Sequence, residues 1–375
     1  MDFIPVNEPL LNGNEKKYLC ECIDTGWISS EGPFVKEFEA KMSASVGRKY
    51  GISVCNGTAA LEVAVQALHI SEGDEVIMPT FTIISCAEAV TRVGGIPVFV
   101  DSDRDTWNMR VDQIEKKITS KTKAIMVVHI YGLPVDMGTV LDIAERHDLK
   151  IIEDAAEMHG QTYNGRPCGS FGDVSIFSFY PNKHITTGEG GMIVTNDEAL
   201  AERCRSLRNL CFQKGVRYVH EELSGNYRFT NLQAAIGLAQ LERIDEFVEK
   251  KRRMGRRYTE LLQGVEGIKL PVESEGENRN IYWVYGIVLD DKVSCDNREF
   301  VRRLGDKGIG ARTFFWCMHE QPVYTSEGMF AGEKYPVAEK LARRGLYIPS
   351  GLALSDEQME TVAVELKKVL AETMG

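Results

Sequence analysis

The stretch that decides the fold is residues 122–154, TKAIMVVHIYGLPVDMGTVLDIAERHDLKIIED. It holds a strand-like run (124–129) that is apolar up to residue 128, a segment with apolar residues at helical spacing (137–147) and a second strand-like run (150–153). A strand that is apolar on both sides, followed by an amphipathic helix and another such strand, predicts a parallel β–α–β unit. Both faces of these strands must be covered by other elements.

The same alternation extends in both directions, over about residues 49–195. It predicts an α/β fold whose large domain contains a mostly parallel sheet with helices on both faces. Ligands bind such sheets at the carboxyl ends of the strands, so the residues just after each strand are the candidates for chemistry. The predicted strands are 50–54, 75–78, 97–101, 124–129, 150–153, 174–179 and 192–195, and the predicted helices include 58–68, 111–118 and 137–147.

After residue 245 the pattern changes to a long charged helix (245–262) and then to a smaller α+β arrangement. We therefore divide the chain into a large ligand-binding domain, residues 1–245, and a small C-terminal domain, residues 246–375. The basic run 250–257, KKRRMGRR, has acidic residues on either side, which favours a solvated helix face over a binding patch. Further strands are predicted near 282–289 and 310–315, and further helices near 297–307, near 338–344 and over the last twenty residues.

Composition excludes several classes of protein. The 375 residues carry 55 acidic and 44 basic side chains, a formal charge of −11, which argues against a nucleic-acid partner. A few local donors can still bind a single phosphorylated ligand. The longest apolar run falls far short of the ~20 residues of a membrane span, and no signal-peptide pattern opens the chain. Nine cysteines without metal-ligand spacing indicate reduced thiols, a cytoplasmic protein and no metal site.

Residues 178–191, SFYPNKHITTGEGG, carry the most chemistry. Here a strand runs into Lys183 and then into a glycine-rich turn. A lysine that is partly desolvated at a sheet edge becomes an amine nucleophile and can form a Schiff base with an aldehyde. Taken alone, the segment is better explained by an ordinary exposed loop lysine, and His184 by a loop histidine with a nearby hydrogen-bond partner.

Two further strand ends change that balance. Asp154 follows the strand at 150–153, where a carboxylate can pair with a protonated pyridine nitrogen or simply cap a helix. Residues 54–60, VCNGTAA, join a strand to a helix, so that Gly57, Thr58 and the free N–H groups could cradle a monophosphate, unless they only cap the helix. Three such segments in one alternating domain favour a binding site for a phosphorylated cofactor.

These segments also carry a family resemblance. Residues 13–15 (GNE), 27–30 (WISS), 56–61 (NGTAAL), 153–157 (EDAAE), the Lys183 segment and 225–235 (GNYRFTNLQAA) together span most of the chain. In them the sequence resembles the sugar-nucleotide aminotransferases of the DegT/DnrJ/EryC1/StrS type. The resemblance implies the aspartate-aminotransferase-like fold of pyridoxal-phosphate enzymes, fold type I.

The resemblance also implies residue roles. Lys183 would form the Schiff base with pyridoxal 5′-phosphate and later shuttle a proton, Asp154 would hold the ring nitrogen, and Glu157 would lie near the ring hydroxyl. Lys183 and Asp154 are thus the expected catalytic residues. The expected phosphate-binding residues are Gly57, Thr58 and Ser178, and Ala59 is a further expected cofactor-binding residue. Asn226 would reach the phosphate of the neighbouring subunit in a homodimer. The expected sugar-pocket residues are Trp27, Ser29, Arg312 and His319.

Two positions stand out against the family pattern. An aromatic residue usually stacks on the cofactor ring, but the corresponding residue here is Ile83, with Phe81 two residues earlier. An aliphatic side chain loses the aromatic contribution, about 0.5–1.5 kcal/mol. Related sugar 3-dehydratases place histidine where this chain has Lys183, so the lysine favours aminotransfer over dehydration.

We therefore expect a cytoplasmic aminotransferase acting on a nucleotide-linked 4-keto-6-deoxy sugar, with L-glutamate as amino donor. The first candidate substrate is GDP-4-keto-6-deoxy-D-mannose, which would be converted to its 4-amino sugar. A UDP- or dTDP-linked sugar, or amination at C3, remains open as an alternative. A regulatory protein that binds pyridoxal phosphate without turnover is the alternative from another class.

Overall fold

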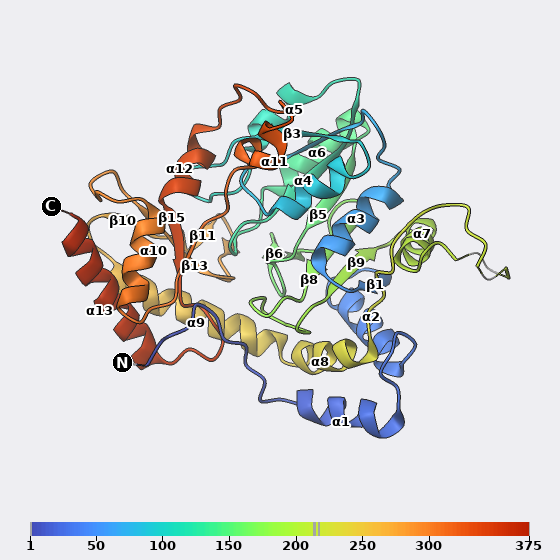
Figure 1. Ribbon diagram of the computed structural model, residues 1–375, viewed down its shortest axis with the longest axis horizontal. Helices are drawn as coiled ribbons and strands as arrows, with labels where there is room; N and C mark the ends of the chain where they lie inside the picture. Colours follow the sequence, from blue (N-terminus) through green and yellow to red (C-terminus); the bar gives the residue numbers. More distant parts are fainter. Residues whose placement is uncertain (1, 213–214, 217, 375) are drawn as a thin grey trace.

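The computed structural model describes residues 2–212, 215–216 and 218–374, and it contains two main β-sheets with helices around them (Figure 1). The larger sheet has seven strands, and the predicted α/β fold with a large, mostly parallel sheet is confirmed. Strand β9 runs antiparallel to both of its neighbours, β1 and β8. Across the sheet the strands are β1 (Tyr50–Val54), β9 (Gly191–Thr195), β8 (Val174–Ser178), β5 (Lys150–Asp154), β4 (Thr122–Val128), β2 (Glu75–Pro79) and β3 (Ile96–Val100).

Alternate residues of the central strands bury into two different layers of helices. Ala124 and Met126 of β4 lie in the core that includes α3, α4 and α7, whereas Ile125 and Val127 lie in the core that includes α5 and α6. The continuous apolar run of this strand is therefore explained by burial on both faces. The helices of this part are α1 (Glu15–Thr25), α2 (Pro33–Ser45), α3 (Gly57–Ala67), α4 (Ile84–Thr91), α5 (Ile114–Lys117), α6 (Met137–His147), α7 (Glu198–Arg208) and α8 (Asn231–Leu241).

The second sheet has four strands and lies at the left of Figure 1. It packs with the helices at 244–262, 297–306 and 356–373 around its own apolar core, whereas the buried residues of the other C-terminal helices belong to the core of the large sheet. Its strands are β10 (Ile268–Lys269), β13 (Tyr285–Leu289), β15 (Gly345–Ile348) and β14 (Arg312–Thr313), and its helices are α9 (Ile244–Leu262), α10 (Asn297–Asp306), α11 (Pro322–Thr325), α12 (Pro336–Arg344) and α13 (Asp356–Thr373). Two short hairpins complete the strands, β6 (Thr162–Tyr163) with β7 (Arg166–Pro167) and β11 (Ser274–Glu275) with β12 (Asn278–Arg279).

Two predicted elements are shorter than expected. The segment 111–118 forms a 3₁₀ turn (Val111–Gln113) and the four-residue α5 instead of one helix. The strand expected at 310–315 is reduced to β14. In both places the apolar spacing is present, but the run is too short for pattern alone to distinguish a regular element from a turn.

Helix α9 is the long charged helix expected near 245–262, and it continues the line of α8 across the lower half of the molecule, above α1 (Figure 1). The proposed division at residue 245 falls in its first turn. Most of its basic run is solvated and ion-paired, for example between Arg256 and Glu249. Lys251 is the exception, because it is only 1% exposed.

The burial of Lys251 corrects the prediction that the whole run is a solvated face. Phe247, Lys251, Met254 and Tyr258 follow one another at helical spacing, and all four are buried. The Nζ of Lys251 donates hydrogen bonds to the backbone carbonyls of Trp283, at 2.9 Å, and of Ser350. Burial lowers the pKa of Lys251 to about 7.

The N-terminal segment is hydrogen-bonded to the C-terminal part of the chain. Ile4 pairs with Ile309 in a parallel bridge, and the carbonyl of Val6 accepts the N–H of Ser350 at 2.9 Å.

All nine cysteines are free thiols. Among the helices of the described residues, none is both long enough and apolar enough to cross a membrane.

Candidate active site

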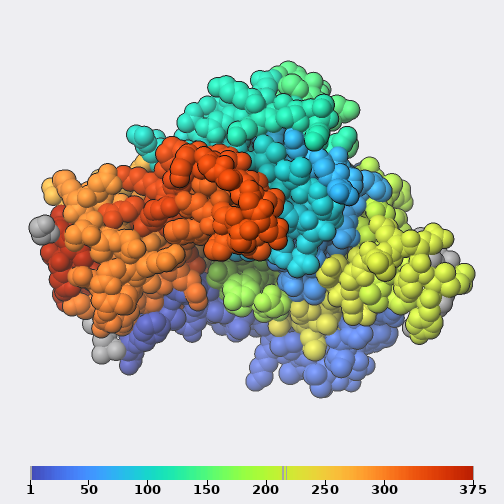
Figure 2. Space-filling view, turned by 45° about the horizontal axis from the view of Figure 1, so that its top comes forward, coloured from blue at the N-terminus to red at the C-terminus, as the bar shows by residue number. Residues whose placement is uncertain are grey.

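A cavity of about 660 Å³ opens at the carboxyl edge of the large sheet. In Figure 2 the surface is recessed below the orange C-terminal part, where the light-green part of the chain lies between it and the blue N-terminal part. Both parts of the chain contribute to the lining, so the cavity is a place where groups from distant segments meet. Lining residues from the ends of β4, β5 and β8 are Val128, Asp154 and Ser178, and those from the C-terminal part are Trp283, Val284, Arg312, Phe315 and Tyr347.

Lys183 projects into this cavity from the loop after β8. Its side chain is 11% exposed, and its Nζ lies 3.7 Å from Oε1 of Glu157. The same Nζ lies 3.8 Å from the centroid of the Trp283 ring. Burial lowers the pKa of Lys183, which increases the fraction of neutral amine and so favours nucleophilic attack.

Asp154 is the last residue of β5 and is 3% exposed. Its Oδ1 accepts the N–H of Ala156 at 3.0 Å, and its Oδ2 accepts the thiol of Cys86 at 3.3 Å. Burial raises the pKa of Asp154, although these two hydrogen bonds and the charge of Lys183 act to lower it. A buried carboxylate that has one backbone N–H and one weak thiol donor is short of partners. It is therefore suited to receive a cationic N–H group from a ligand.

Glu157 lies three residues further along the chain and is also buried. Its Oε2 accepts the N–H of Tyr131 at 2.7 Å. Burial raises the pKa of Glu157 to about 8, although the nearby charge of Lys183 lowers it. At neutral pH this side chain is therefore protonated to a large extent and can donate a hydrogen bond to an oxygen of a ligand.

The start of helix α3 forms a cradle for an anion. Gly57 lies so close to Ser178 that an added Cβ would be 2.8 Å from the Ser178 Cβ. The hydroxyl groups of Thr58 and Ser85 are 2.8 Å apart and can share a proton in either direction. The first N–H groups of a helix lack intrahelical acceptors, and the helix dipole is positive at this end. Hydroxyls, free N–H groups and a helix N-terminus form a donor set for a phosphate.

Some of the predicted site residues line the cavity and others do not. His319 is 4% exposed and is hydrogen-bonded through Nδ1 to Oγ1 of Thr80 at 2.8 Å, so that it links the end of β2 to the C-terminal part. The N–H of Ala59 is accepted by the capping side chain of Asn56. The predicted residues that line the cavity are Gly57, Thr58, Asp154, Glu157, Ser178, Lys183 and Arg312; within the described part of the chain, Trp27, Ser29, Ala59, Asn226 and His319 are outside the lining.

Several lining residues were missed by sequence reasoning. Asn7 comes from the N-terminal segment, and its Nδ2 donates to the carbonyl of Pro181 at 3.0 Å. Trp283 and Tyr347 come from the second sheet. Nothing local marks these residues, since each reaches the cavity only through tertiary packing. Ser85 had a usable signal, because it ends the strand-to-helix segment that contains Ile83.

Ile83 lines the cavity and is 43% exposed, whereas Phe81 is fully buried. The ring of Phe81 packs edge-on to Tyr131, with centroids 6.0 Å apart. The assignment of the ring-packing position to Ile83 stays a prediction, and the geometry leaves Phe81 in the core behind it.

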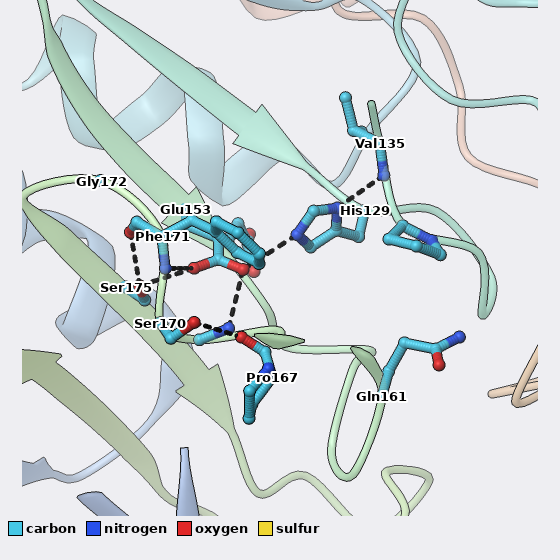
Figure 3. A network of polar contacts seen from close by, with 12 residues as sticks. His129, Val135, Glu153, Gln161, Pro167, Ser170, Phe171, Gly172 and Ser175 are labelled. Atoms are coloured by element: carbon cyan, nitrogen blue, oxygen red, sulfur yellow. Dashed lines mark hydrogen bonds and ion pairs between the residues drawn. The ribbon is translucent and has the colours of Figure 1, made fainter. Parts of the chain in front are cut away.

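A second buried network lies on the other face of β5 (Figure 3). The carboxylate of Glu153 accepts the N–H groups of Gly169 and Phe171, at 2.7 and 2.9 Å, and the hydroxyl of Ser175 at 2.7 Å. Because Nδ1 of His129 accepts the N–H of Val135, its Nε2 carries the proton and donates to Glu153 at 3.1 Å. Burial alone would raise the pKa of Glu153, but these bonds keep it below the ordinary value.

The chain is similar to known proteins over nearly its whole length. A model of the DegT/DnrJ/EryC1/StrS aminotransferase family matches residues 9–367. The GDP-perosamine synthase of Escherichia coli O157:H7 is 44% identical over 360 residues, 96% of both chains, and that of Caulobacter vibrioides is 42% identical over 367 residues, 98% of both. The crystal structure of an aminotransferase TlmJ from Streptoalloteichus hindustanus has a TM-score of 0.91 at 31% identity, covering 99% of this chain and 100% of that one.

Proposed function

Because the chain belongs to the DegT/DnrJ/EryC1/StrS aminotransferase family, we propose that it transfers an amino group from L-glutamate to C4 of GDP-4-keto-6-deoxy-D-mannose. Its cofactor is pyridoxal phosphate. The observation that carries the proposal is the desolvated amine of Lys183 in a cavity with two buried carboxyl groups, Asp154 and Glu157. The choice of a GDP-linked sugar rests on the likeness to the GDP-perosamine synthases.

The residues around the cavity fit pyridoxal phosphate. Its phosphate would be held by Gly57, Thr58 and Ser178. A side chain at position 57 would meet Ser178, so that only a glycine leaves space for an anion there. Asp154 would hold the protonated ring nitrogen, which supplies the partner that its carboxylate lacks. The protonated carboxyl of Glu157 would donate to the ring oxygen.

The chemistry divides between cofactor and chain. When bound, the cofactor supplies an aldehyde that takes up the amino group and a conjugated ring that delocalises the electron pair left on the reacting carbon. Lys183 would move the proton from the donor carbon to the cofactor in the first half-reaction, and would move a proton from the cofactor to the sugar carbon in the second. General acid–base work of this kind contributes ~10²–10⁴ in rate. Asp154 keeps a negative charge beside the ring nitrogen throughout.

Binding of the two anionic substrates needs local positive groups, because the whole chain is acidic. Arg312 lines the cavity from β14 and is the proposed partner of the sugar diphosphate. Its side chain is exposed, so it is available to a ligand that enters from solvent.

We further propose that two copies of the chain form a homodimer with shared sites. Trp27 is 51% exposed and Ile28 48% exposed at the end of α1, an apolar surface that a second copy would cover. In this arrangement Trp27, Ser29 and Asn226 act in the site of the partner subunit. An equimolar mixture of Lys183→Ala and Asn226→Ala chains tests this, because exchanged dimers would regain up to about a quarter of wild-type activity if sites are shared. No recovery after verified subunit exchange would contradict it.

The reaction is placed in the cytoplasm, where the nine free thiols stay reduced. The substrate is tested with a panel of GDP-, UDP- and dTDP-linked 4-keto-6-deoxy sugars, each with L-glutamate. Mass spectrometry should find the replacement of a carbonyl oxygen by an amine on the GDP sugar, and NMR should place it at C4. Amination of a UDP or dTDP sugar with higher kcat/KM, or amination at C3, would replace this substrate assignment.

Lys183→Ala and Lys183→Arg serve as paired controls for the chemistry. The first removes the amine and the second keeps the positive charge without a usable amine nucleophile, so both should abolish turnover. A regulatory protein without turnover would instead bind pyridoxal phosphate but leave every glutamate and sugar pair unchanged. Robust turnover by Lys183→Ala would contradict the mechanism.

A further inference from the structure

We propose that Trp283 is a positioning residue for Lys183, whose ring face holds the lysine ammonium beside Glu157 whenever the lysine is free. Only the consequence for catalysis rests on the proposed function, because the contact itself belongs to the chain without cofactor. The proposal joins a residue of the C-terminal part to the amine that projects from the large sheet.

The geometry is that of a cation–π contact. Nζ of Lys183 lies 3.8 Å from the centroid of the Trp283 ring, well inside the ~6 Å range of such contacts. Trp283 is 3% exposed and the Lys183 side chain 11% exposed, so little water screens the attraction. Tryptophan has the ring with the strongest attraction for a cation.

Two contacts hold the ring of Trp283 in place, and a third holds its backbone. The Nε1–H of Trp283 donates to the carbonyl of Asn182, the residue next to the lysine, at 2.8 Å. The backbone carbonyl of Trp283 accepts the buried Nζ of Lys251 at 2.9 Å. The ring stacks on Tyr131, with centroids 5.7 Å apart and planes inclined by 30°. Its hydrogen bond to Trp283 gives the buried Lys251 a structural role that a lysine on a solvated helix face would not have.

The charge of Lys183 is set by several groups around it. Asp154 of β5 and Glu157 in the turn after it favour the ammonium form. The buried thiol of Cys86 in α4, whose pKa is raised well above its ordinary value, stays neutral. The basic groups near Lys183 are His159, His184 and Lys251, and burial is the first cause that lowers the pKa of each.

The neighbouring histidines cannot take over the role of the ring. Both ring nitrogens of His159 lack hydrogen-bond partners among the described residues, and burial lowers its pKa to about 3, so it is neutral. His184 is buried with Nε2 3.3 Å from the carbonyl of Ile281. The ring of Trp283 is therefore an uncharged group that favours the ammonium form of Lys183. During turnover it would keep the freed lysine within reach of the carbon that exchanges its proton.

The contact is tested on the full-length chain after treatment with hydroxylamine to remove bound aldehyde. Cyanate, a small reagent that carbamylates only neutral amines, is applied at fixed pH, and Lys183 modification is followed by peptide mass spectrometry. Trp283→Leu keeps the apolar surroundings and removes the ring. Because the ammonium then loses its partner, the carbamylation rate at Lys183 should rise about three- to tenfold. Trp316→Leu is the matched control, since Trp316 contacts Arg298 and Arg343 instead of a lysine and should change nothing.

A second series avoids any failure of Trp283→Leu to fold. The chain has 4 tryptophans, and biosynthetic incorporation of mono- and difluorinated tryptophan weakens the negative ring face with little change of shape. The rate at Lys183 should rise stepwise with fluorine content, also in a Trp316→Phe background. A rate independent of fluorination, or equal rates for Trp283→Leu and Trp316→Leu, would overturn the proposal. Neither readout involves sugar turnover, so a failed substrate assignment leaves this test intact.

Discussion

Glu153 and Asp154 are consecutive residues of β5, both fully buried or nearly so, yet their carboxylates have opposite surroundings. Glu153 receives two backbone N–H groups, a serine hydroxyl and a histidine N–H. Asp154 receives one backbone N–H and one thiol. The pKa of the first is lowered and that of the second is raised, although burial acts on both in the same direction.

The difference follows from the pleat of the strand. Successive side chains point to opposite faces of a sheet, so that Glu153 faces the layer of loops after β7 and Asp154 faces α4 and the cavity. Hydrogen bonds saturate the carboxylate on the face that supports the fold. On the other face, the carboxylate of Asp154 has fewer hydrogen-bond donors, at the place where a ligand is expected to bind. A buried carboxylate is thus informative about function only together with a count of its donors.

Glu153→Gln should have the largest effect on stability. The amide would place an NH₂ group against one of the N–H donors of Gly169 or Phe171, and a buried charged network would be broken. The expected loss is about 3–5 kcal/mol in the free energy of unfolding, measured by urea denaturation. Glu145→Gln, at an exposed position of α6, is the control that should stay near wild type.

Asp154→Asn should show the reverse pattern. Turnover should fall by a factor on the order of 10²–10³, as when one preorganised electrostatic group is removed, while the free energy of unfolding stays at or above the wild-type value. Steady-state kinetics and the same denaturation assay measure the two parts. If Asp154→Asn destabilised the chain as much as Glu153→Gln, the contrast between the two faces would be lost.

Gly57→Ala extends the contrast to the phosphate cradle. The new Cβ would lie 2.8 Å from the Ser178 Cβ, and overpacking of this kind costs about 1–3 kcal/mol. If this cost is taken from cofactor binding, the Kd for pyridoxal phosphate rises about 5- to 150-fold, as measured by absorbance titration. Gly305→Ala in α10, where an added Cβ meets nothing within 4 Å, should leave the Kd unchanged.

Glu157→Gln should change the pH dependence of stability, seen as a slope. Since the pKa of Glu157 is raised to about 8 in the folded chain, the folded chain keeps a proton between about pH 5 and 8 that the unfolded chain has released. Stability contributed by this group therefore falls as pH rises, by at most ~1.4 kcal/mol per pH unit. Glu157→Gln should remove that slope in unfolding measurements across the window. Lys183, whose pKa is lowered, acts in the opposite direction above its folded pKa and is common to both proteins. If the wild type and Glu157→Gln had the same slope, Glu157 would be ionised in the folded chain across this pH range.

Much of this arrangement could be predicted from the sequence. The seven strands of the large sheet were each marked by an apolar run, and Asp154, Thr58 and Lys183 could be brought together because they follow strands of one parallel sheet. The antiparallel direction of β9 could not be predicted, because apolar runs carry no direction.

Other features depended on packing that no local pattern reports. Trp283 and Asn7 reach the cavity from segments distant in the chain. Lys251 was hidden within a run of like charges, although its spacing from Phe247 and Tyr258 placed it on the buried side of the helix. The donors of Glu153 come from a loop whose course a single sequence does not predict.

The N-terminal segment makes the place of one cavity residue depend on a distant part of the chain. Ile4 exchanges backbone hydrogen bonds with Gly308 and Gly310, at 2.9 and 2.8 Å, and Asn7 donates to the carbonyl of Pro181, in the loop that carries Lys183. The segment that leads to Asn7 can therefore be held in place only after the residues near 308–310 have folded. A substitution in that distant segment would thus loosen the anchor of one wall of the lysine pocket.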